Sequence, residues 1–426
     1  MHHIIIGAGP AGVIAAETIR KHAPQDDITI IGDEKETPYS RMAIPYLLIG
    51  NVGEQGTHLR RSATHFTDKK ITLQQDTVKL VDAKAKTLTL GSGKTLNFDK
   101  LLIATGSRPV KPPIPGMDVA GVHNCWTMAD ARKILALAQP NARVLQMGAG
   151  FIGCIILEAL AVRGVKLTVV EMGDRMVPRM MGPTAGGMIK DWCETKGVEV
   201  LTGTKVEAIE AGSPIGVRLS NGRHVQVDLV ISATGVKPAI AFLENSGITC
   251  LQGVLTDEHM QTNVPGIYAA GDCAEAFDKI SNTTIVSAIQ PNAADQALVA
   301  AMNMVGKPAV LKGVTQINVL DTLGMISTSF GNWQGVKGGE HVELTDKAAG
   351  RHLSLQFDKD VMVGCNSVGW IDHVGAMRGL VEGKVKLGEW KARLQADPTQ
   401  LMTAYLATAQ GQGQWTGAAD VGRRGN

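Results

Sequence analysis

Short apolar runs, each followed by a glycine-rich turn, organise the first half of the chain. Residues 4–6 are three consecutive isoleucines, a β-branched run typical of a buried parallel strand. A glycine turn and a helical pattern follow, and then residues 28–31 form a second apolar run. The same order recurs later, with apolar runs at 144–147 and 165–170 on either side of a glycine turn and a helical pattern. This alternation predicts two βαβ units.

The remaining segments show weaker periodicities. Residues 195–228 alternate polar and apolar positions in the manner of a small meander. The pieces expected as strands after residue 310 are 315–319, 325–328, 353–357 and 361–365. Amphipathic patterns near 371–384 and 398–409 predict two helices. The stretch 411–426 is polar and glycine-rich, and we expect it to fray.

Composition and charge exclude several classes of protein. The 426 residues include 42 Lys and Arg and 40 Asp and Glu, a net charge of +2 that leaves no surplus for a nucleic-acid partner. No apolar run approaches the roughly 18 residues of a membrane span, and the start lacks the pattern of a signal peptide, so we expect a cytoplasmic protein without a membrane partner. The six cysteines show no C-x-x-C spacing and the histidines no paired-ligand spacing, so no metal site is predicted.

The first glycine turn has the G-x-G-x-x-G pattern that binds a dinucleotide. In such a turn the first glycine permits the bend, the second lets the backbone approach a pyrophosphate, and the third lets the helix pack on the strand. The helix N-terminus supplies N–H groups to the anion, and an acid about 20 residues later takes the ribose hydroxyls. The residues of this turn and its acids are Gly7, Gly9, Pro10, Ala11, Gly12, Asp33 and Glu34.

The second glycine turn repeats this pattern between the later apolar runs. Its residues are Gly148, Gly150, Phe151, Ile152 and Gly153, with Glu171 as the acid. Because Glu171 accepts hydrogen bonds from a free 2′-hydroxyl and repels a 2′-phosphate, we expect NADH to be favoured over NADPH. Arg175 and Arg179 lie just beyond it, and because their positive charges suit a 2′-phosphate, NADPH stays an alternative.

Three further strand-to-turn motifs surround the two units. Residues 101–109 (Leu-Leu-Ile-Ala-Thr-Gly-Ser-Arg-Pro) run into a glycine turn, 229–235 repeat it, and 266–274 end in Gly-Asp-Cys-Ala. Together with the two turns, this set resembles the pyridine nucleotide–disulfide oxidoreductase superfamily, in the branch of ferredoxin and rubredoxin reductases and NADH oxidases. The specific motifs cover about residues 1–310.

The resemblance implies an α/β fold with two Rossmann-like dinucleotide-binding domains, for FAD and NAD, and a C-terminal α+β interface domain that forms homodimers. The expected FAD-binding domain is discontinuous, 1–112 and 236–310. The NAD-binding domain is expected at 113–235, entered through the Pro-rich segment 111–116. The C-terminal domain is expected at 311–426.

The resemblance also assigns parts of the cofactors to residues. Asp33, with Glu34 as a close second, would bind the ADP half of FAD, and the backbone at Val78 would meet its adenine. Asp272 would hydrogen-bond the ribityl chain or the pyrophosphate, and Gln290 opens a helix whose N-terminus faces the flavin pyrimidine carbonyl. The other expected contacts are Arg41, Ala104, Thr105 and Gly106 with FAD, and Gly235 with the nicotinamide. Hydride then passes from NADH to the flavin without a protein acid or base, so no catalytic residue is expected.

The sequence departs from the family pattern at four positions. Met42 stands where CoA-disulfide reductases keep a redox cysteine, and a thioether forms no mixed disulfide, which disfavours disulfide reduction. Tyr46 and Ile155 stand where ferredoxin reductases place a Lys–Glu pair, and Glu158, one helical turn on, is a possible substitute. Trp126 replaces an arginine near the FAD.

We therefore expect an FAD-dependent NAD(P)H:acceptor oxidoreductase that passes electrons to a small redox protein such as ferredoxin or rubredoxin. The alternatives are a peroxide-forming NADH oxidase, because reduced flavin without the cysteine would yield hydrogen peroxide, and an FAD-binding redox subunit or interaction protein with little NADH activity.

Overall fold

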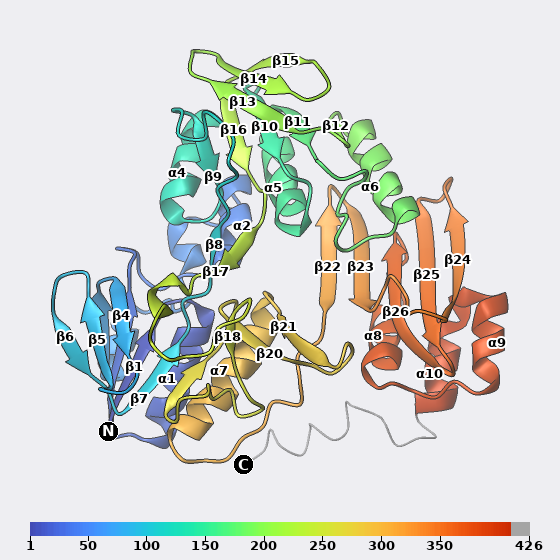
Figure 1. Cartoon of the computed structure of the whole chain (residues 1–426). Helices are drawn as coiled ribbons and strands as arrows, with labels where there is room; N and C mark the ends of the chain where they lie inside the picture. The colour runs from blue at the N-terminus through green and yellow to red at the C-terminus, as the bar shows by residue number, and fades with distance from the viewer. Residues whose placement is uncertain (410–426) are drawn as a thin grey trace. The chain divides into compact units, whose positions relative to one another are not determined.

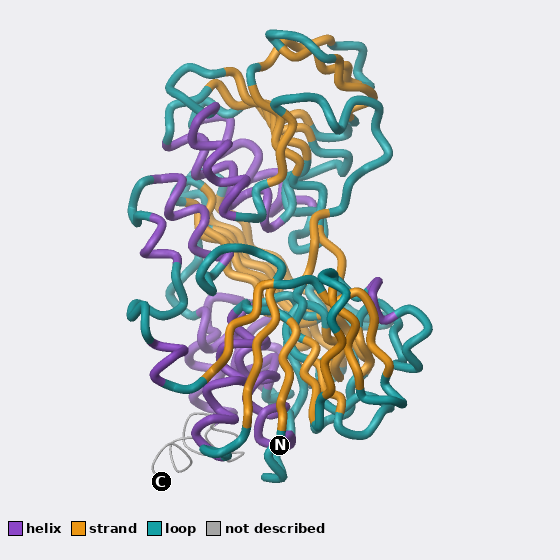
Figure 2. The backbone as a smooth tube through the Cα atoms, turned by 90° about the vertical axis from the view of Figure 1, so that its left-hand side faces the viewer, coloured by secondary structure: helices purple, strands orange, loops and turns teal. Residues whose placement is uncertain are grey.

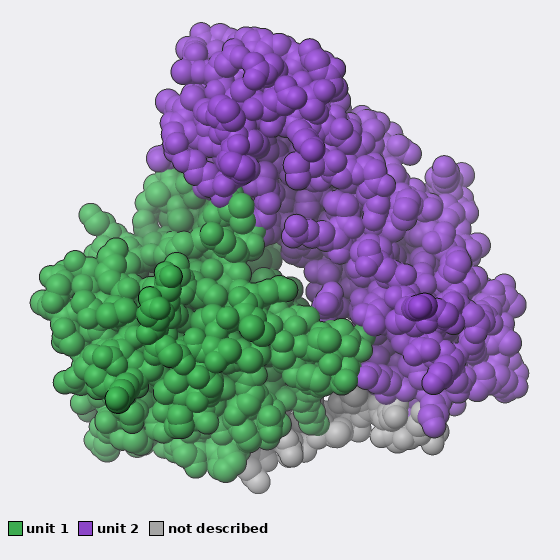
Figure 3. Space-filling view, in the orientation of Figure 1, with its two compact units in different colours: residues 1–110, 126–132, 236–314 green, residues 111–125, 133–235, 315–426 purple. Residues whose placement is uncertain are grey.

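The computed structural model describes residues 1–409, so the predicted fraying of 411–426 lies outside the described residues. The chain forms two compact units (Figure 3). The first comprises Met1–Val110, Trp126–Arg132 and Val236–Val314, and the second comprises Lys111–Cys125, Lys133–Gly235 and Thr315 onward. The NAD-binding and C-terminal domains expected from the sequence thus share one unit, and the three-domain boundaries stay a prediction.

A five-stranded parallel sheet forms the centre of the first unit, in the order β19-β7-β1-β2-β3, and its strands β1 and β7 are labelled in Figure 1. Its first strands and the helix between them confirm the βαβ unit predicted from the isoleucine run and the glycine turn. Its strands are β1 (His2–Ile6), β2 (Asp27–Gly32), β3 (Ile71–Gln75), β7 (Lys100–Ile103) and β19 (Ile267–Ala269).

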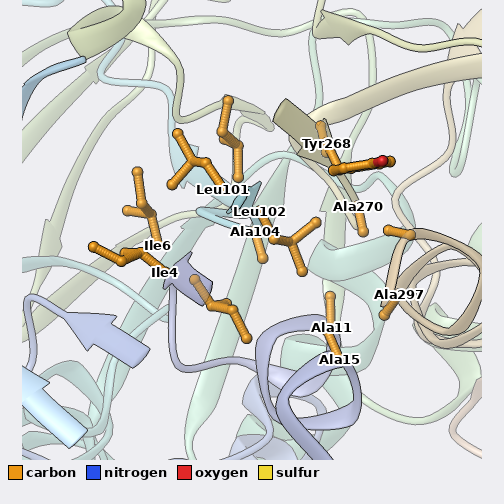
Figure 4. Close-up of a cluster of buried hydrophobic side chains, with 14 of the residues drawn as sticks. Ile4, Ile6, Ala11, Ala15, Leu101, Leu102, Ala104, Tyr268, Ala270 and Ala297 are labelled. Atoms are coloured by element: carbon orange, nitrogen blue, oxygen red, sulfur yellow. The ribbon is translucent and has the colours of Figure 1, made fainter. Parts of the chain in front are cut away.

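Helices α1 (Pro10–His22) and α7 (Gln290–Met304) pack together beside this sheet. Small side chains allow the close approach: Ala15 of α1 and Ala297 of α7 are fully buried in the same apolar cluster as Leu102 of β7 (Figure 4). This packing holds the N-terminus of each helix beside the carboxyl edge of the sheet, where ligands of such folds bind.

Smaller elements complete the first unit. An antiparallel sheet consists of β4 (Val78–Asp82), β5 (Thr87–Leu90) and β6 (Thr95–Asn97). The other strands are β8 (Ser107–Pro109) paired with β17 (Val236–Pro238), and the sheet of β18 (Val254–Leu255), β20 (Ala274–Asp278) and β21 (Thr283–Val286). The short helices are η1 (Arg41–Ala43), α2 (Ile44–Ile49), η2 (Glu54–Thr57), α3 (His65–Asp68) and η3 (Ala241–Leu243).

The second unit contains its own parallel sheet, in the order β12-β11-β10-β16-β9, and a meander. Both features confirm the sequence prediction. The sheet consists of β9 (Val122–Asn124), β10 (Arg143–Met147), β11 (Lys166–Val170), β12 (Glu199–Leu201) and β16 (Leu229–Ser232). The meander is β13 (Val206–Glu210), β14 (Ile215–Leu219) and β15 (His224–Val227), and the helices are α5 (Phe151–Val162) and α6 (Pro183–Thr195). Helix α4 (Met128–Leu137) begins in the first unit and ends in the second.

A five-stranded antiparallel sheet, in the order β22-β23-β26-β25-β24, forms the C-terminal part of the second unit. Figure 2 shows the strands of the sheets in orange and the helices in purple. The strands are β22 (Ile317–Thr322), β23 (Met325–Gly331), β24 (Glu340–Asp346), β25 (Arg351–Asp358) and β26 (Val361–Val368). The helices are α8 (Val374–Glu382), α9 (Glu389–Ala396), the short η4 (Pro398–Gln400) and α10 (Leu401–Ala409).

Two of these elements were not predicted from the sequence. Strand β24 is an edge strand whose residues are mostly exposed on both faces, and α9 buries only Leu394. Neither element therefore carries the apolar periodicity on which the prediction rested.

Among residues 1–409, no helix combines the length and the apolar character that a membrane span requires.

Candidate cofactor-binding sites

The first glycine turn joins β1 to α1 through very close backbone contacts. A Cβ atom at Gly7 would lie 2.1 Å from the carbonyl oxygen of Ala104, and one at Gly12 would lie 2.0 Å from the carbonyl oxygen of Gly7. Gly7 also has a φ of +116°, which favours glycine. By contrast, a Cβ at Gly9 would meet no atom within 4 Å. Two glycines are thus required by packing, and the middle one leaves open space at the N-terminus of α1.

The second glycine turn reproduces this arrangement between β10 and α5. A Cβ at Gly148 would lie 2.5 Å from the Ala233 carbonyl oxygen, and one at Gly153 would lie 2.6 Å from the Gly148 carbonyl oxygen. A Cβ at Gly150 would again meet nothing within 4 Å. Phe151 and Ile152 form the first turn of the helix, whose N–H groups point at the open space.

A cavity of about 490 Å³ opens beside the first glycine turn, within the first unit. Gly7 and Asp33 lie at its wall together with Val78, the residue expected next to adenine. Thr105 also lines it, and Gly106 has a φ of +65° in the turn that follows β7. The open space at Gly9 and this cavity fit the pyrophosphate and the adenosine of FAD.

The two acids at the end of β2 have different surroundings. Asp33 lines the cavity and forms an ion pair with Arg108, which also lines it. Glu34 does not line the cavity, and its carboxylate accepts hydrogen bonds from the Tyr39 hydroxyl at 2.6 Å and from Arg41 at 2.7 Å. Asp33 therefore fits the ribose better than Glu34 does.

Asp272 lies in a buried turn that follows β19. The Ser107 hydroxyl donates a hydrogen bond to its Oδ2 at 2.8 Å. Burial raises the pKa of the Asp272 carboxyl, while the Ser107 hydrogen bond and the nearby positive charge of Arg41 act in the opposite direction. A half-buried carboxylate with one donor retains acceptor sites for a hydroxyl of the ribityl chain.

Gln290, the first residue of α7, is exposed, and its Oε1 accepts a hydrogen bond from Ser40 at 3.1 Å. Ser40 precedes η1, so the segment with Arg41 and Met42 lies against the N-terminus of α7. This places an oriented helix end beside the segment that the resemblance puts next to the flavin.

Glu171 is held by the backbone around the second glycine turn. Its carboxylate accepts hydrogen bonds from the N–H groups of Ala149 and Gly173, each at 2.7 Å. Arg175 donates to the Met181 and Pro178 carbonyls and to Asp174, so its guanidinium is already engaged. This arrangement fits a free 2′-hydroxyl better than a phosphate. Gly235, the position expected beside the nicotinamide, has a φ of +111°.

The residues that depart from the family pattern occupy distinct places. Met42 and Tyr46 are 51% and 55% exposed and lie one helical turn apart across η1 and α2. Ile155 is half-buried on α5. Burial raises the pKa of Glu158, and so does the nearby negative charge of Asp321 on β22. Glu158 thus lies beside the C-terminal sheet.

Three buried polar side chains fix the turns, and the glycine motifs did not indicate them. Gln146 donates to the carbonyls of both Gly148 and Gly153 at 2.9 Å, and Gln296 accepts from the Gly271 N–H at 2.8 Å. Ser107 is the third. The sequence signal for such a side chain is a polar residue inside an apolar run, as with Gln146 in Val144-Leu145-Gln146-Met147.

We expect Gly9→Ala to fold normally but to weaken FAD binding at least tenfold. The φ of −79° and ψ of −174° at Gly9 suit alanine, yet the added methyl group fills the space that the pyrophosphate needs. Titration of the apoprotein with FAD, followed by flavin fluorescence, measures the affinity. The matched variant Gly12→Ala should instead lower the melting temperature, because its Cβ collides with the Gly7 carbonyl. Normal FAD affinity of Gly9→Ala would contradict the assignment.

We expect Glu171→Gln to raise the KM for NADH about tenfold, the effect of one lost charge-assisted hydrogen bond. Discrimination against NADPH should fall, because the charge that repels a 2′-phosphate is removed. Steady-state reduction of ferricyanide with each nucleotide measures both effects. Glu194→Gln, on the exposed side of α6, is the control and should leave both unchanged. If Glu171→Gln leaves the ratio of the KM values for NADH and NADPH unchanged, the role of Glu171 in choosing between them is disproved.

Comparisons with known proteins agree with this geometry. Residues 1–298 match the family model described as pyridine nucleotide-disulphide oxidoreductase. The subunit epsilon of NADH-dependent phenylglyoxylate dehydrogenase from Aromatoleum evansii is 31% identical over 402 residues, 93% of this chain and 95% of that protein. An NADH oxidase from Methanocaldococcus jannaschii is 33% identical over 78% of this chain and 77% of its own. Rhodocoxin reductase from Rhodococcus erythropolis is 31% identical over 72% of each chain.

Among solved structures, an NAD-dependent persulfide reductase from A. fulgidus superposes with a TM-score of 0.85 and 27% identity, covering 91% of this chain and 78% of that one. The expected α/β fold, the two cofactors and the enzyme class are confirmed. The chain therefore belongs to the pyridine nucleotide-disulphide oxidoreductase family and is an FAD- and NAD(H)-dependent oxidoreductase.

Proposed function

We propose that the protein takes electrons from NADH and delivers them to a small redox protein such as ferredoxin or rubredoxin. The observation that carries this proposal is Met42, which by the resemblance stands where CoA-disulfide reductases keep a redox cysteine, and which is half exposed. A thioether supplies no thiolate, so disulfide chemistry has no protein nucleophile there. The similarity to rhodocoxin reductase supports a protein acceptor.

The proposed FAD site lies entirely in the first unit. Bound FAD would accept two electrons as a hydride from NADH and release them singly. In this proposal the turn from Gly7 to Gly12 holds the pyrophosphate, Asp33 the adenosine ribose and Asp272 the ribityl chain. The remaining residues proposed to contact FAD are Arg41, Val78, Ala104, Thr105, Gly106 and Gln290.

The proposed NADH site lies in the second unit. Here the turn from Gly148 to Gly153 holds the pyrophosphate and Glu171 the adenosine ribose, while Gly235 gives the nicotinamide room. The preference for NADH over NADPH rests on the two backbone N–H groups that fix the Glu171 carboxylate and on the engagement of Arg175.

Two other functions have a specific observation in their favour. The relative from Aromatoleum evansii, which matches nearly the whole chain, is a subunit of a larger dehydrogenase, and this supports an FAD-bearing subunit within a complex. The relative from Methanocaldococcus jannaschii is an NADH oxidase, which supports direct transfer to oxygen.

We further propose a cytoplasmic homodimer formed through the C-terminal domain, for which analytical ultracentrifugation gives the mass.

We expect NADH, mixed anaerobically with the holoenzyme in a stopped-flow instrument, to bleach the flavin absorbance faster than NADPH does. Reoxidation of the reduced enzyme should then be faster with a purified [2Fe–2S] ferredoxin or a rubredoxin than with air-saturated buffer. The rate of flavin reduction and the rate of reoxidation together separate the three functions, because each function predicts a different pair of these rates.

Equal reoxidation by oxygen and by both proteins would support the NADH oxidase instead. Failure of both nucleotides to bleach the flavin, in a protein that retains FAD, would overturn the proposal and favour the subunit of a complex.

A further inference from the structure

We propose that Trp126 is a positioning residue for FAD, acting through Ser107 on the carboxylate of Asp272. This inference rests on the proposed role of Asp272 in holding the ribityl chain or pyrophosphate of FAD. Trp126 stands where the ferredoxin reductase branch has an arginine, so its role here belongs to this chain.

A hydrogen-bonded chain connects the indole to the carboxylate within the first unit. The Trp126 Nε1–H donates to the Ser107 carbonyl oxygen at 3.1 Å, and the Ser107 hydroxyl donates to Asp272 Oδ2 at 2.8 Å. Ser107 is only 5% exposed, so little solvent competes for these bonds. The indole thereby fixes the main chain of the residue whose side chain orients Asp272.

Trp126 is itself held on two sides. Its backbone N–H and that of Thr127 donate to Asp130 at 3.2 and 2.9 Å, which fixes the backbone at the start of α4. On the other side Arg41 donates to the Trp126 carbonyl oxygen at 2.6 Å, and its guanidinium lies 5.3 Å from the centre of the indole ring. The backbone of Trp126 is therefore fixed by hydrogen bonds, and its indole contacts Arg41 through the ring face and Ser107 through Nε1–H.

This arrangement matters because the Asp272 carboxylate is half-buried, between the buried residues Gly271 and Cys273. A carboxylate that is partly withdrawn from water binds a ligand hydroxyl well only when its own orientation is fixed and its charge is compensated. Ser107 supplies the hydrogen bond, and Arg41, which also pairs with Glu34, supplies the positive charge. Trp126 contacts both of these residues.

The test measures FAD affinity in Trp126→Phe, which removes the indole N–H and keeps an aromatic ring under Arg41. We expect the dissociation constant for FAD to rise about fivefold to tenfold, as for loss of one buried hydrogen bond. Ser107→Ala should weaken binding by at least as much. Because both residues act through one chain of bonds, the double variant should bind no more weakly than Ser107→Ala alone.

Trp192→Phe is the matched control. Its indole N–H donates to the Leu323 carbonyl at the same distance, 3.1 Å, but in the second unit. It should lower the melting temperature of the apoprotein, measured by circular dichroism, without changing the affinity for FAD. A purely structural role of Trp126 would give the same pattern as this control.

The inference is overturned if a folded Trp126→Phe variant binds FAD with wild-type affinity. It is also overturned if the FAD dissociation constant of the double variant rises by the product of the two single fold-changes. If Trp126→Phe does not fold, an unchanged FAD affinity of Ser107→Ala overturns it as well. The outcome is distinguishable from failure of the proposed function, because FAD binding is measured without NADH or an acceptor.

Discussion

The structure depends on backbone contacts that leave no room for a side chain. At each glycine turn the chain leaves a parallel strand and enters a helix. The first glycine lies against a carbonyl at the end of the neighbouring strand, and the third residue of the helix lies against the carbonyl of the first glycine. These two contacts set the distance between strand and helix, and hence the position of the helix N-terminus. The middle glycine touches nothing, and the space it leaves is what an anionic pyrophosphate requires.

Around this constraint the site is built from segments that are distant in sequence. Parallel strands bring their carboxyl ends to one edge, so the turns after β1, β2, β7 and β19 converge in the first unit. Buried polar side chains then fix the turns: Gln296 holds the Gly271 N–H, and Ser107 holds Asp272. Unpaired buried groups are costly, so these bonds restrict the turns to one geometry.

The departures from the family pattern bear on chemistry and leave the fold unchanged. Met42 removes the thiol on which disulfide reduction depends, while the two dinucleotide turns remain intact. Met42 and Tyr46, on η1 and α2, are both exposed.

Local sequence patterns predict the two βαβ units, the meander and the family, because apolar runs and glycine turns have a direct physical meaning. They do not indicate β24 and α9, whose exposed residues carry no such pattern. The resemblance ranked Asp33 before Glu34, and the tertiary structure adds that Asp33 lies at the cavity whereas Tyr39 and Arg41 engage Glu34. Only the tertiary structure joined Trp126 to Asp272 through Ser107. These contacts span up to 165 positions in the sequence, and strand order, not local propensity, brings such residues together.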